Sequence, residues 1–418
     1  MKNWMRLLCV MLVVLMLNGC GLFTAYTVEG EVEEKKEPIS KVEKEEDATE
    51  STGGIYIYDE NIFFAGGKLD ELMDLCDEVF IGETDRLTME DAAAAAIVES
   101  LGDRWSYYIP AAEYNSYVEQ MANAYVGVGI TIQVREDEKG YDIVAVEKTG
   151  PAYEAGLLPG DVLVGANDVN FIGADVNEAS SIIKGEEGTT VDIHVQRDGK
   201  EMTFTVERRT IQITVAEGEM LPGNVGLVTI ANFDSRCASE SIAAIESLLE
   251  QGATSLIFDV RYNPGGYAHE LVQLLDYLLP EGDLFIAEDY LGNRSVDGSD
   301  ASCLEIPMVV MVNGDSFSAA EFFAAALRDY EWATVVGEQT VGKGYFQQSF
   351  ELSDGSAVNL SVGKYFTPGG VSLAEVGGLT PDVVVEVDDE MYLDIYYGNV
   401  KNEEDPQIQA ALEALKAG

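Results

Sequence analysis

The chain has 418 residues, and its 75 Asp and Glu against 25 Lys and Arg residues give a formal net charge of −50 at pH 7. A negative charge of this size argues against binding to nucleic acid and against electrostatic attraction to anionic lipid. Three cysteines follow position 20, and their odd number and wide spacing exclude a disulfide framework or a cysteine-based metal cluster, although one bridge stays open. The length suffices for two or three domains behind an N-terminal leader.

The first 20 residues are predicted to be an export signal. Lys2 and Arg6 precede an apolar run from Leu7 to Leu17, which is too short for a membrane span. The small residue before Cys20 resembles a bacterial lipobox, which implies cleavage before Cys20 and a diacylglyceryl group on its sulfur. An ordinary signal peptide that is cut elsewhere is the alternative. With the lipobox, the protein would be exported and lipid-anchored to the outer face of the bacterial cell membrane.

Residues 21–53 are predicted to be a disordered acidic spacer, and residues 54–120 a helical region. The spacer is rich in Glu, Lys and Thr and poor in apolar residues, so it cannot bury a core. In the helical region the clearer helices cover Lys68 to Phe80 and Met89 to Leu101, and another begins at Ala111. The apolar content favours a small helical domain over a connector between domains.

Residues 121–210 change to short strands and turns. A strand begins within Gly127 to Ile132, and Val191 to Val195 is expected to form a hairpin with Met202 to Val206. This pattern resembles a PDZ domain, in which a glycine-rich loop binds a peptide carboxylate through backbone N–H groups and the next strand pairs with the peptide. The loop residues implied here are Val126, Gly127, Val128, Gly129 and Ile130. Their glycines fit plain turn residues equally well, so the prediction depends on the pattern of the whole domain.

Residues 211–390 alternate strands with helices, and residues 391–418 are predicted to be a helical tail. The expected strands are Val225 to Ile230, Thr254 to Val260, Pro307 to Val312 and Ala333 to Gly337, and the expected helices are Ala238 to Gln251, Ala268 to Leu279 and Ser318 to Asp329. Continuous apolar strands between helices indicate a largely parallel sheet that is covered on both faces. In such sheets the site lies at the carboxyl ends of the strands. The turn Asn263 to Gly266 and Ser318 both fall there.

Only two histidines are present, His194 and His269, and both are predicted to be structural. His194 lies in an alternating strand pattern, and His269 opens an amphipathic helix. Ser318, by contrast, follows a buried strand and opens a helix of small residues. At such an elbow a hydroxyl meets free backbone N–H groups and the positive end of the helix dipole. Ser318 is therefore the candidate nucleophile, and Ser316 is expected to be a loop or cap residue.

Lys343 is the candidate base. An exposed lysine has a pKa near 10.4, and burial would have to lower it by about 3 units for the amine to act near neutral pH. If the segment is extended, Gln347 lies on the same face as Lys343, so its amide could orient the amine. The spacing from Gly337 to Lys343 also fits a phosphate-binding loop, but Gly344 replaces the residue that binds magnesium and a strand follows. We therefore reject the nucleotide alternative.

An acyl-transfer site also needs an oxyanion hole. The backbone amide of Ala319, directly after the candidate nucleophile, is one expected donor. The turn at Asn263 to Gly266 can present a second donor, for which we favour Gly265, because backbone without side chains suits an approaching carbonyl group. A simple connection between strand and helix is the alternative reading of that turn.

Five segments together resemble the carboxyl-terminal processing peptidases. They are Asp259 to Gly266, Ser316 to Glu321, Val336 to Gly344, Tyr365 to Gly369 and Gly378 to Asp382. In that family the second serine of the block is the nucleophile, a lysine twenty-five residues later is the base and a glutamine four residues further orients it. Ser318, Lys343 and Gln347 have this spacing. The chain departs from the usual pattern of this family at three places. Phe317 stands where a small residue is usual, Ala320 stands where serine is common, and the segment after Pro368 lacks the usual arginine.

The sequence thus predicts a multidomain α/β protein with a helical N-terminal region, a β-rich PDZ domain and an α/β catalytic core with a largely parallel sheet. The resemblance implies an exported, membrane-anchored serine endopeptidase, without metal or cofactor, that cleaves proteins or peptides near or from their C-termini by a Ser-Lys mechanism. The alternative is a catalytically silent PDZ adaptor at the cell surface. The substrate stays unnamed, and the oligomeric state stays open, with a homodimer as one option.

Overall fold

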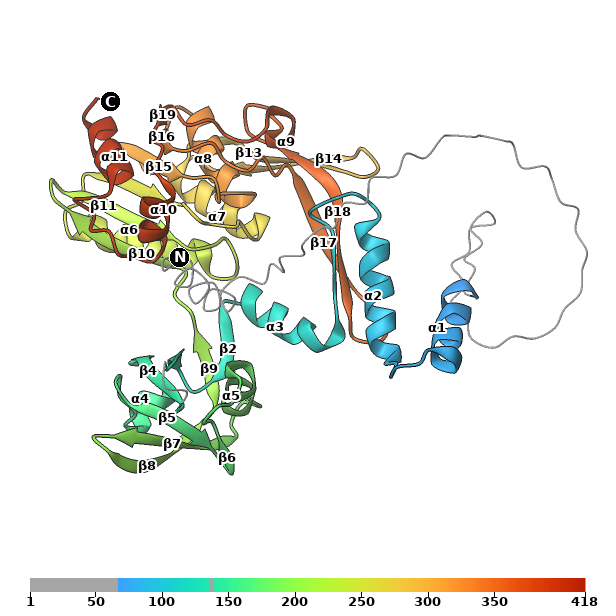
Figure 1. The fold of residues 1–418 in the computed structure, drawn as a ribbon. Helices are drawn as coiled ribbons and strands as arrows, with labels where there is room; N and C mark the ends of the chain where they lie inside the picture. Colours follow the sequence, from blue (N-terminus) through green and yellow to red (C-terminus); the bar gives the residue numbers. More distant parts are fainter. Residues whose placement is uncertain (1–66, 136–138, 418) are drawn as a thin grey trace, which may run out of the picture. The chain divides into compact units, whose positions relative to one another are not determined.

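The structure is a computed structural model that describes residues 67–135 and 139–417 (Figure 1). The predicted export signal with Cys20, the acidic spacer and the start of the helical region lie outside these residues. Among the described helices, none combines the length and the apolar character needed to cross a membrane.

The N-terminal region contains three helices and one short strand. They are α1 (Lys68–Val79), α2 (Arg86–Glu99), β1 (Tyr107–Ile109) and α3 (Ala111–Met121). Helix α2 begins three residues earlier than predicted, because the Asp85 side chain caps it by accepting a hydrogen bond from the Thr88 N–H at 3.3 Å. The loop between α2 and β1 covers residues 100–106.

The next part is the β-rich domain whose sequence pattern resembles a PDZ domain. Its strands are β2 (Ala124–Gly127), β3 (Ile130–Val134), β4 (Tyr141–Val146), β5 (Val162–Ala166), β6 (Val169–Asn170), β7 (Thr190–Arg197), β8 (Lys200–Glu207) and β9 (Arg209–Gln212), and its helices are α4 (Pro151–Ala155) and α5 (Val176–Ile183). The predicted hairpin is confirmed as β7 and β8, with Val191 paired to Val206. Asp198 and Gly199 both have positive φ at its turn, which matches the twist of the strands. The main sheet has the order β3-β4-β5-β7-β8, so β3 is an edge strand.

The α/β core predicted for residues 211–390 is built on a second sheet of order β10-β11-β12-β15-β16-β19. These strands are β10 (Ala216–Leu221), β11 (Val225–Ile230), β12 (Ser255–Asp259), β15 (Met308–Val312), β16 (Ala333–Gly337) and β19 (Val383–Val384). All neighbours from β11 to β19 are parallel, and only β10 is antiparallel. The predicted, largely parallel sheet is therefore confirmed.

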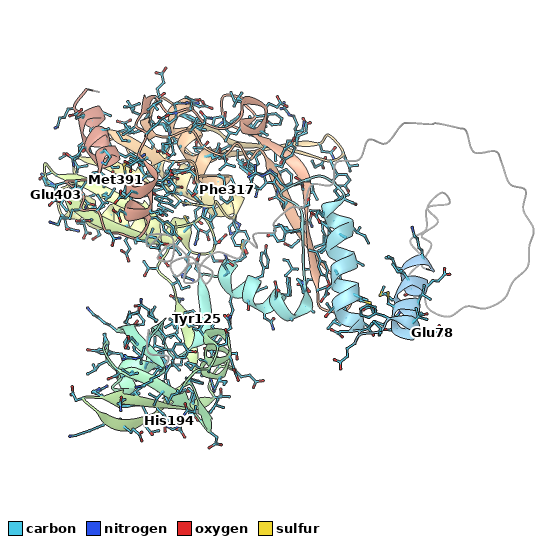
Figure 2. The ribbon with its side chains drawn as sticks, in the orientation of Figure 1. Glu78, Tyr125, His194, Phe317, Met391 and Glu403 are labelled. Carbon is cyan, nitrogen blue, oxygen red and sulfur yellow. The ribbon has the colours of Figure 1, made fainter. Side chains whose placement is uncertain are left out.

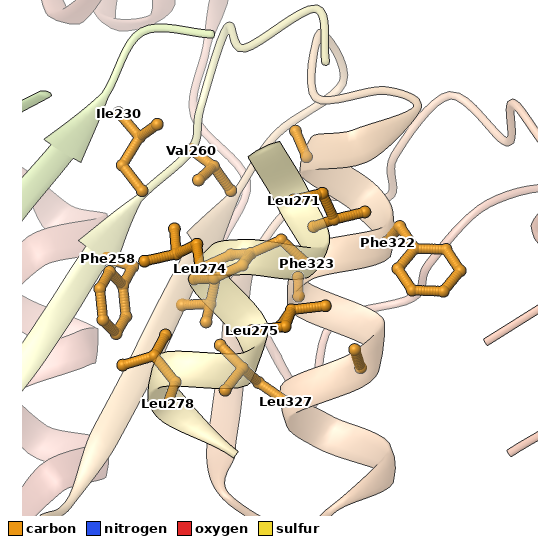
Figure 3. Packing of buried hydrophobic residues seen from close by; sticks show 14 of the residues in the cluster. Ile230, Phe258, Val260, Leu271, Leu274, Leu275, Leu278, Phe322, Phe323 and Leu327 are labelled. Atoms are coloured by element: carbon orange, nitrogen blue, oxygen red, sulfur yellow. The ribbon is translucent and has the colours of Figure 1, made fainter. Parts of the chain in front are cut away.

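Helices cover both faces of this sheet. On one face lie α6 (Cys237–Glu250), α7 (Ala268–Leu278) and α8 (Ala319–Asp329). Figure 3 shows Leu274 of α7 and Phe323 of α8 packed beside Phe258 of the sheet. On the other face Ile408 and Ala411 of α11 (Pro406–Ala417) join a separate cluster with buried residues of the strands. This double cover explains why the strands consist almost wholly of apolar residues.

A third sheet was largely missed by the sequence prediction. It contains β1, β13 (Gly282–Asp289), β14 (Arg294–Ser299), β17 (Tyr345–Glu351) and β18 (Ala357–Phe366), all antiparallel. Most of β14 and half of β17 are exposed, so these strands carry no continuous apolar signal. The remaining helices are α9 (Leu373–Val376) and α10 (Asp389–Tyr396).

Candidate active site

Ser318 lies in a strained turn between β15 and α8. Its backbone has φ 59° and ψ −123°, a conformation that costs a non-glycine residue about 1–3 kcal/mol and that concentrates at functional sites. Ser318 N–H donates to Glu321 Oε2 at 2.9 Å, and Ala319 begins the helix. Its predecessor Phe317 is labelled in Figure 2. The strand-turn-helix elbow expected from the sequence is therefore present at Ser318.

Ser316, the other serine of the block, is a structural residue. Its hydroxyl is fully buried, donates to the Val260 carbonyl at 2.7 Å and accepts from the Asn313 N–H at 3.0 Å. The Phe317 N–H donates to the Asn263 carbonyl at 3.1 Å. These bonds join the loop after β15 to the loop after β12, so the nucleophile loop and the predicted oxyanion turn form one unit.

Gly265 lies directly against the candidate nucleophile. Its φ is 89°, and a Cβ at this position would stand 2.7 Å from Ser318 Cβ and 2.8 Å from Ala319 N. Glycine is required here both by the backbone conformation and by this close approach. The Gly265 N–H donates to Asn263 Oδ1 at 2.8 Å, so it would have to exchange that acceptor for a substrate oxygen. The Ala319 N–H has no acceptor within the described residues.

Gly265→Ala is expected to lower kcat/KM for peptide cleavage by about a hundredfold, because the new methyl group must displace Ser318 or the turn. Gly252→Ala is the matched control. Gly252 also has a positive φ, 97°, but its Cβ would meet no atom within 4 Å. The control carries the same kind of backbone strain and should keep its activity. Equal losses of activity in both variants would show that strain alone, rather than the contact with Ser318, matters.

Lys343 lies half-buried in the loop that leads into β17. Burial lowers its pKa to about 8, while the Asp103 and Glu321 carboxylates oppose this shift and Arg104 adds to it. The Lys343 Nζ lies 4.9 Å from the centre of the Trp105 ring, which itself stacks on Phe317 at 5.9 Å. The amine therefore has the depressed pKa that a general base needs near neutral pH.

Two side chains bring Ser318 and Lys343 together. Oε2 of the buried Glu321 accepts from both backbone amides at 2.9 Å, and Oε1 accepts from the Thr340 hydroxyl and from the Gly342 N–H. The Tyr365 hydroxyl donates to the Lys343 carbonyl and also contacts the Ser318 side chain. No hydrogen bond joins the Ser318 and Lys343 side chains to each other in the described structure.

Glu321 joins the Ser318 and Lys343 segments through hydrogen bonds, and sequence reasoning missed this contact. Burial raises the pKa of its carboxyl group, and the hydrogen bonds from Thr340, Gly342, Lys343 and Ser318 lower it. The available signal was a glutamate three residues after a serine that opens a helix, which is the pattern of a capping box. What that pattern could not indicate is that the same carboxylate also holds the Lys343 loop.

Gln347 does not bond to Lys343 in this structure. Strand β17 begins only at Tyr345, so Lys343 lies in the loop before it and the two-residue period of a strand does not link the two side chains. The Gln347 amide instead donates to the Tyr345 carbonyl and to Ser361 Oγ, both at 3.0 Å. The predicted role of Gln347 in orienting Lys343 therefore stays a prediction. It requires the Gln347 amide to leave the Tyr345 carbonyl or Ser361.

The two histidines have structural environments. His194 Nε2 donates to the Asn167 carbonyl at 2.7 Å, and Nδ1 lies 2.9 Å from Thr203 Oγ1. The side chain of His269 is 72% exposed and stacks on Tyr267 at a ring distance of 5.1 Å. Neither residue contacts Ser318.

A cavity of about 980 Å³ lies beside Lys343. It is lined by the loop 101–106, the tip of the β13–β14 hairpin and parts of β17 and β18. Trp105 lies between the cavity and Lys343, since it lines the cavity and its ring contacts the Lys343 amine. Lys343 itself does not line the cavity, so Trp105 is the contact between them.

In the PDZ domain only part of the predicted carboxylate loop has free backbone. Val126 and Gly127 belong to β2, which pairs with β9, and the Val126 N–H donates to Glu119 Oε1 at 3.3 Å. The Gly129 carbonyl accepts from the Glu147 N–H at 2.9 Å, so the N–H of Ile130 points to the open edge of β3. The loop Val128 to Ile130 is thus the segment able to receive a carboxylate.

Comparisons with known proteins agree with this architecture. A family model of peptidase family S41 matches residues 224–385, and a PDZ domain model matches residues 128–207. The carboxy-terminal processing protease CtpA of Bacillus subtilis is 31% identical to this chain. The alignment covers 84% of this chain and 76% of that protein. The carboxyl-terminal-processing protease of Synechocystis sp. is 33% identical over 70% of this chain and 69% of that protein. A solved structure of a photosystem II D1 C-terminal processing protease aligns with 76% of this chain and 86% of its own, at 27% identity and a TM-score of 0.44. Because the similarity to both relatives spans most of their length, the chain belongs to peptidase family S41, among the PDZ-containing carboxyl-terminal processing proteases.

Proposed function

We propose that the protein is an endopeptidase that cleaves protein substrates near or from their C-termini with Ser318 as nucleophile and Lys343 as base. Ser318 attacks the scissile carbonyl, and the neutral Lys343 amine takes its proton and passes it to the leaving amine. A water molecule deprotonated by Lys343 then hydrolyses the acyl-enzyme. The observation that carries this proposal is the half-buried Lys343, whose pKa is lowered to about 8 and whose backbone N–H donates to the same Glu321 oxygen as the backbone N–H of Ser318.

The oxyanion of the tetrahedral intermediate would lie between the loop after β15 and the turn after β12. The free N–H of Ala319 is the first donor in this proposal, and the N–H of Gly265 is the second once it leaves Asn263. The contact between Gly265 and Ser318 supports this assignment, because it brings both donors next to the attacking hydroxyl.

We also propose that the chain is exported and held at the membrane by a lipid on Cys20. The support is the sequence alone, a basic start and a short apolar run that end at a lipobox-like cysteine. Cell fractionation of the wild type and of Cys20→Ala tests this. The wild type should stay with the membrane fraction and Cys20→Ala should be released. Retention of both at equal levels would contradict the lipid anchor.

The proposed capture of C-termini predicts that substrates with a free, apolar C-terminus are cleaved faster than the same chains with an amidated C-terminus. The amide loses charge-assisted hydrogen bonds to the loop Val128 to Ile130, each worth about 1.5–3 kcal/mol before competition from water. We therefore expect at least a tenfold (about 1.4 kcal/mol) difference in apparent affinity, measured from steady-state cleavage of paired peptides.

Removal of residues 128–208 is the control for this prediction. Gly127 pairs with Arg209 in the β2–β9 ribbon, so the two ends of the deletion are neighbours and can be joined. The deletion should erase the preference for the free acid while Ser318 and Lys343 stay in place. Identical kinetics for acid and amide with the intact enzyme would rule out carboxylate capture.

A further inference from the structure

Helix α10 contacts both loops that build the catalytic site, although it lies beyond residues 224–385 that the S41 family model matches. The Tyr392 hydroxyl donates to the Asp315 carboxylate, in the loop that leads to Ser318. The Tyr392 carbonyl accepts from the Tyr262 hydroxyl at 2.8 Å, in the loop that leads to Gly265. A single residue of helix α10 therefore bonds to the nucleophile loop and to the oxyanion turn at once.

Tyr262 needs such support because its own backbone is strained. It has φ 60°, a left-handed conformation that is rare for a bulky side chain. Its N–H donates to Asn313 Oδ1 at 2.9 Å, which fixes it to the nucleophile loop. Its ring packs edge-on against Tyr392 at 4.8 Å and against Tyr396 at 5.2 Å. The strained turn is thus held by two aromatic contacts from α10 in addition to the bond to Asn313.

Helix α10 contributes little else to the packing of the protein. None of its residues is fully buried, so it contributes little to the core. Its position is fixed from its N-terminus, where Asp388 caps the Met391 N–H at 2.9 Å and the Val387 N–H donates to Glu338 Oε1 at 3.0 Å (Figure 2 labels Met391). Glu338 directly follows β16, so this segment is attached to the same carboxyl edge of the sheet that carries the site.

We propose that Tyr392 is a positioning residue that fixes the nucleophile loop relative to the oxyanion turn, and so sets the distance between Ser318 and Gly265. This inference rests on the proposed roles of Ser318 and Gly265. The two residues are already in close contact, and a shift of about 1 Å in such a site can cost about a hundredfold in rate. Burial and the neighbouring Asp315 carboxylate raise the pKa of Tyr392, so its hydroxyl stays protonated and can donate throughout the working range.

The test compares kcat and KM of Tyr392→Phe, Asp315→Ala and the double variant with those of the wild type. Tyr392→Phe should lower kcat about tenfold, with KM within about twofold, because the substrate still binds while the reacting groups are misplaced. The double variant should be no slower than either single variant, since all three lack the same hydrogen bond. Asp315→Asn keeps an acceptor for the hydroxyl and should recover most of the activity.

Tyr397→Phe is the matched control. Tyr397 ends the same helix, its side chain is exposed, and its hydroxyl makes no hydrogen bond within the described residues. This variant should keep the wild-type kcat. Unchanged kcat in Tyr392→Phe, or additive losses in the double variant, would overturn the inference. A fully active Ser318→Ala would overturn the proposed function instead, so the two failures are distinguishable.

Discussion

Ser318→Ala is expected to lower kcat for peptide cleavage by about 10⁴-fold or more, because it removes the proposed nucleophile and the Ser316 hydroxyl is held by Val260 and Asn313. Binding of a C-terminal peptide should persist, since the PDZ domain does not include Ser318. Turnover of an unstructured substrate and peptide binding are measured on the same preparation. Loss of binding together with turnover would point to misfolding rather than to loss of the nucleophile.

Ser316→Ala is the control for this prediction. Its hydroxyl makes two buried hydrogen bonds, so the variant should lose about 1–3 kcal/mol of unfolding free energy while it keeps Ser318. Most of the activity should remain below the melting temperature. A loss of turnover as large as that of Ser318→Ala would contradict the assignment of the nucleophile.

Lys343→Arg is expected to reduce kcat/KM by about 10⁴-fold although it keeps the positive charge. Arginine has a pKa above 12 and stays protonated, so it cannot accept the Ser318 proton. With Lys343 as the proposed base, only its neutral amine can take the Ser318 proton. With a pKa of about 8, kcat/KM should therefore rise with pH up to about 8 and level off above it.

Two control variants test whether the effect of Lys343→Arg comes from loss of the base or from a general effect of charge. Lys401→Arg changes an exposed lysine and should leave the rate and its pH dependence unchanged. Asp103→Asn removes a carboxylate that raises the pKa of Lys343, so the rise of kcat/KM with pH should move to lower pH. Substantial turnover by Lys343→Arg, or a rise that moves to higher pH in Asp103→Asn, would mean that another group is the base.

The elements of the catalytic core could be predicted because their burial leaves a strong pattern. Strands such as β15 are wholly apolar and lie between helices, so their type and their parallel arrangement follow from the sequence. The hairpin of β7 and β8 is likewise marked by Asp198 and Gly199 at its turn. The positions of Ser318 and Gly265 at the carboxyl edge of the sheet follow from the same pattern.

The rest depends on contacts that local sequence does not encode. Most of the third sheet was missed because strands such as β14 are exposed. The expected common face of Lys343 and Gln347 assumed one extended segment, but β17 begins only at Tyr345. The cover of Lys343 by Trp105 joins segments more than 200 residues apart, and no periodicity indicates such a contact. The bond from Tyr392 to Asp315 was missed for the same reason.

The most direct test of the account is mass spectrometry of the enzyme after treatment with an activated ester that acylates nucleophilic serines. We predict one adduct, on the peptide that contains Ser318, which forms faster as the pH rises through about 8 and is absent from Ser318→Ala. Lys343→Arg should bind C-terminal peptides but should not be acylated. A folded wild type that binds such peptides and gives no adduct at Ser318 would contradict the account and favour a catalytically silent PDZ adaptor.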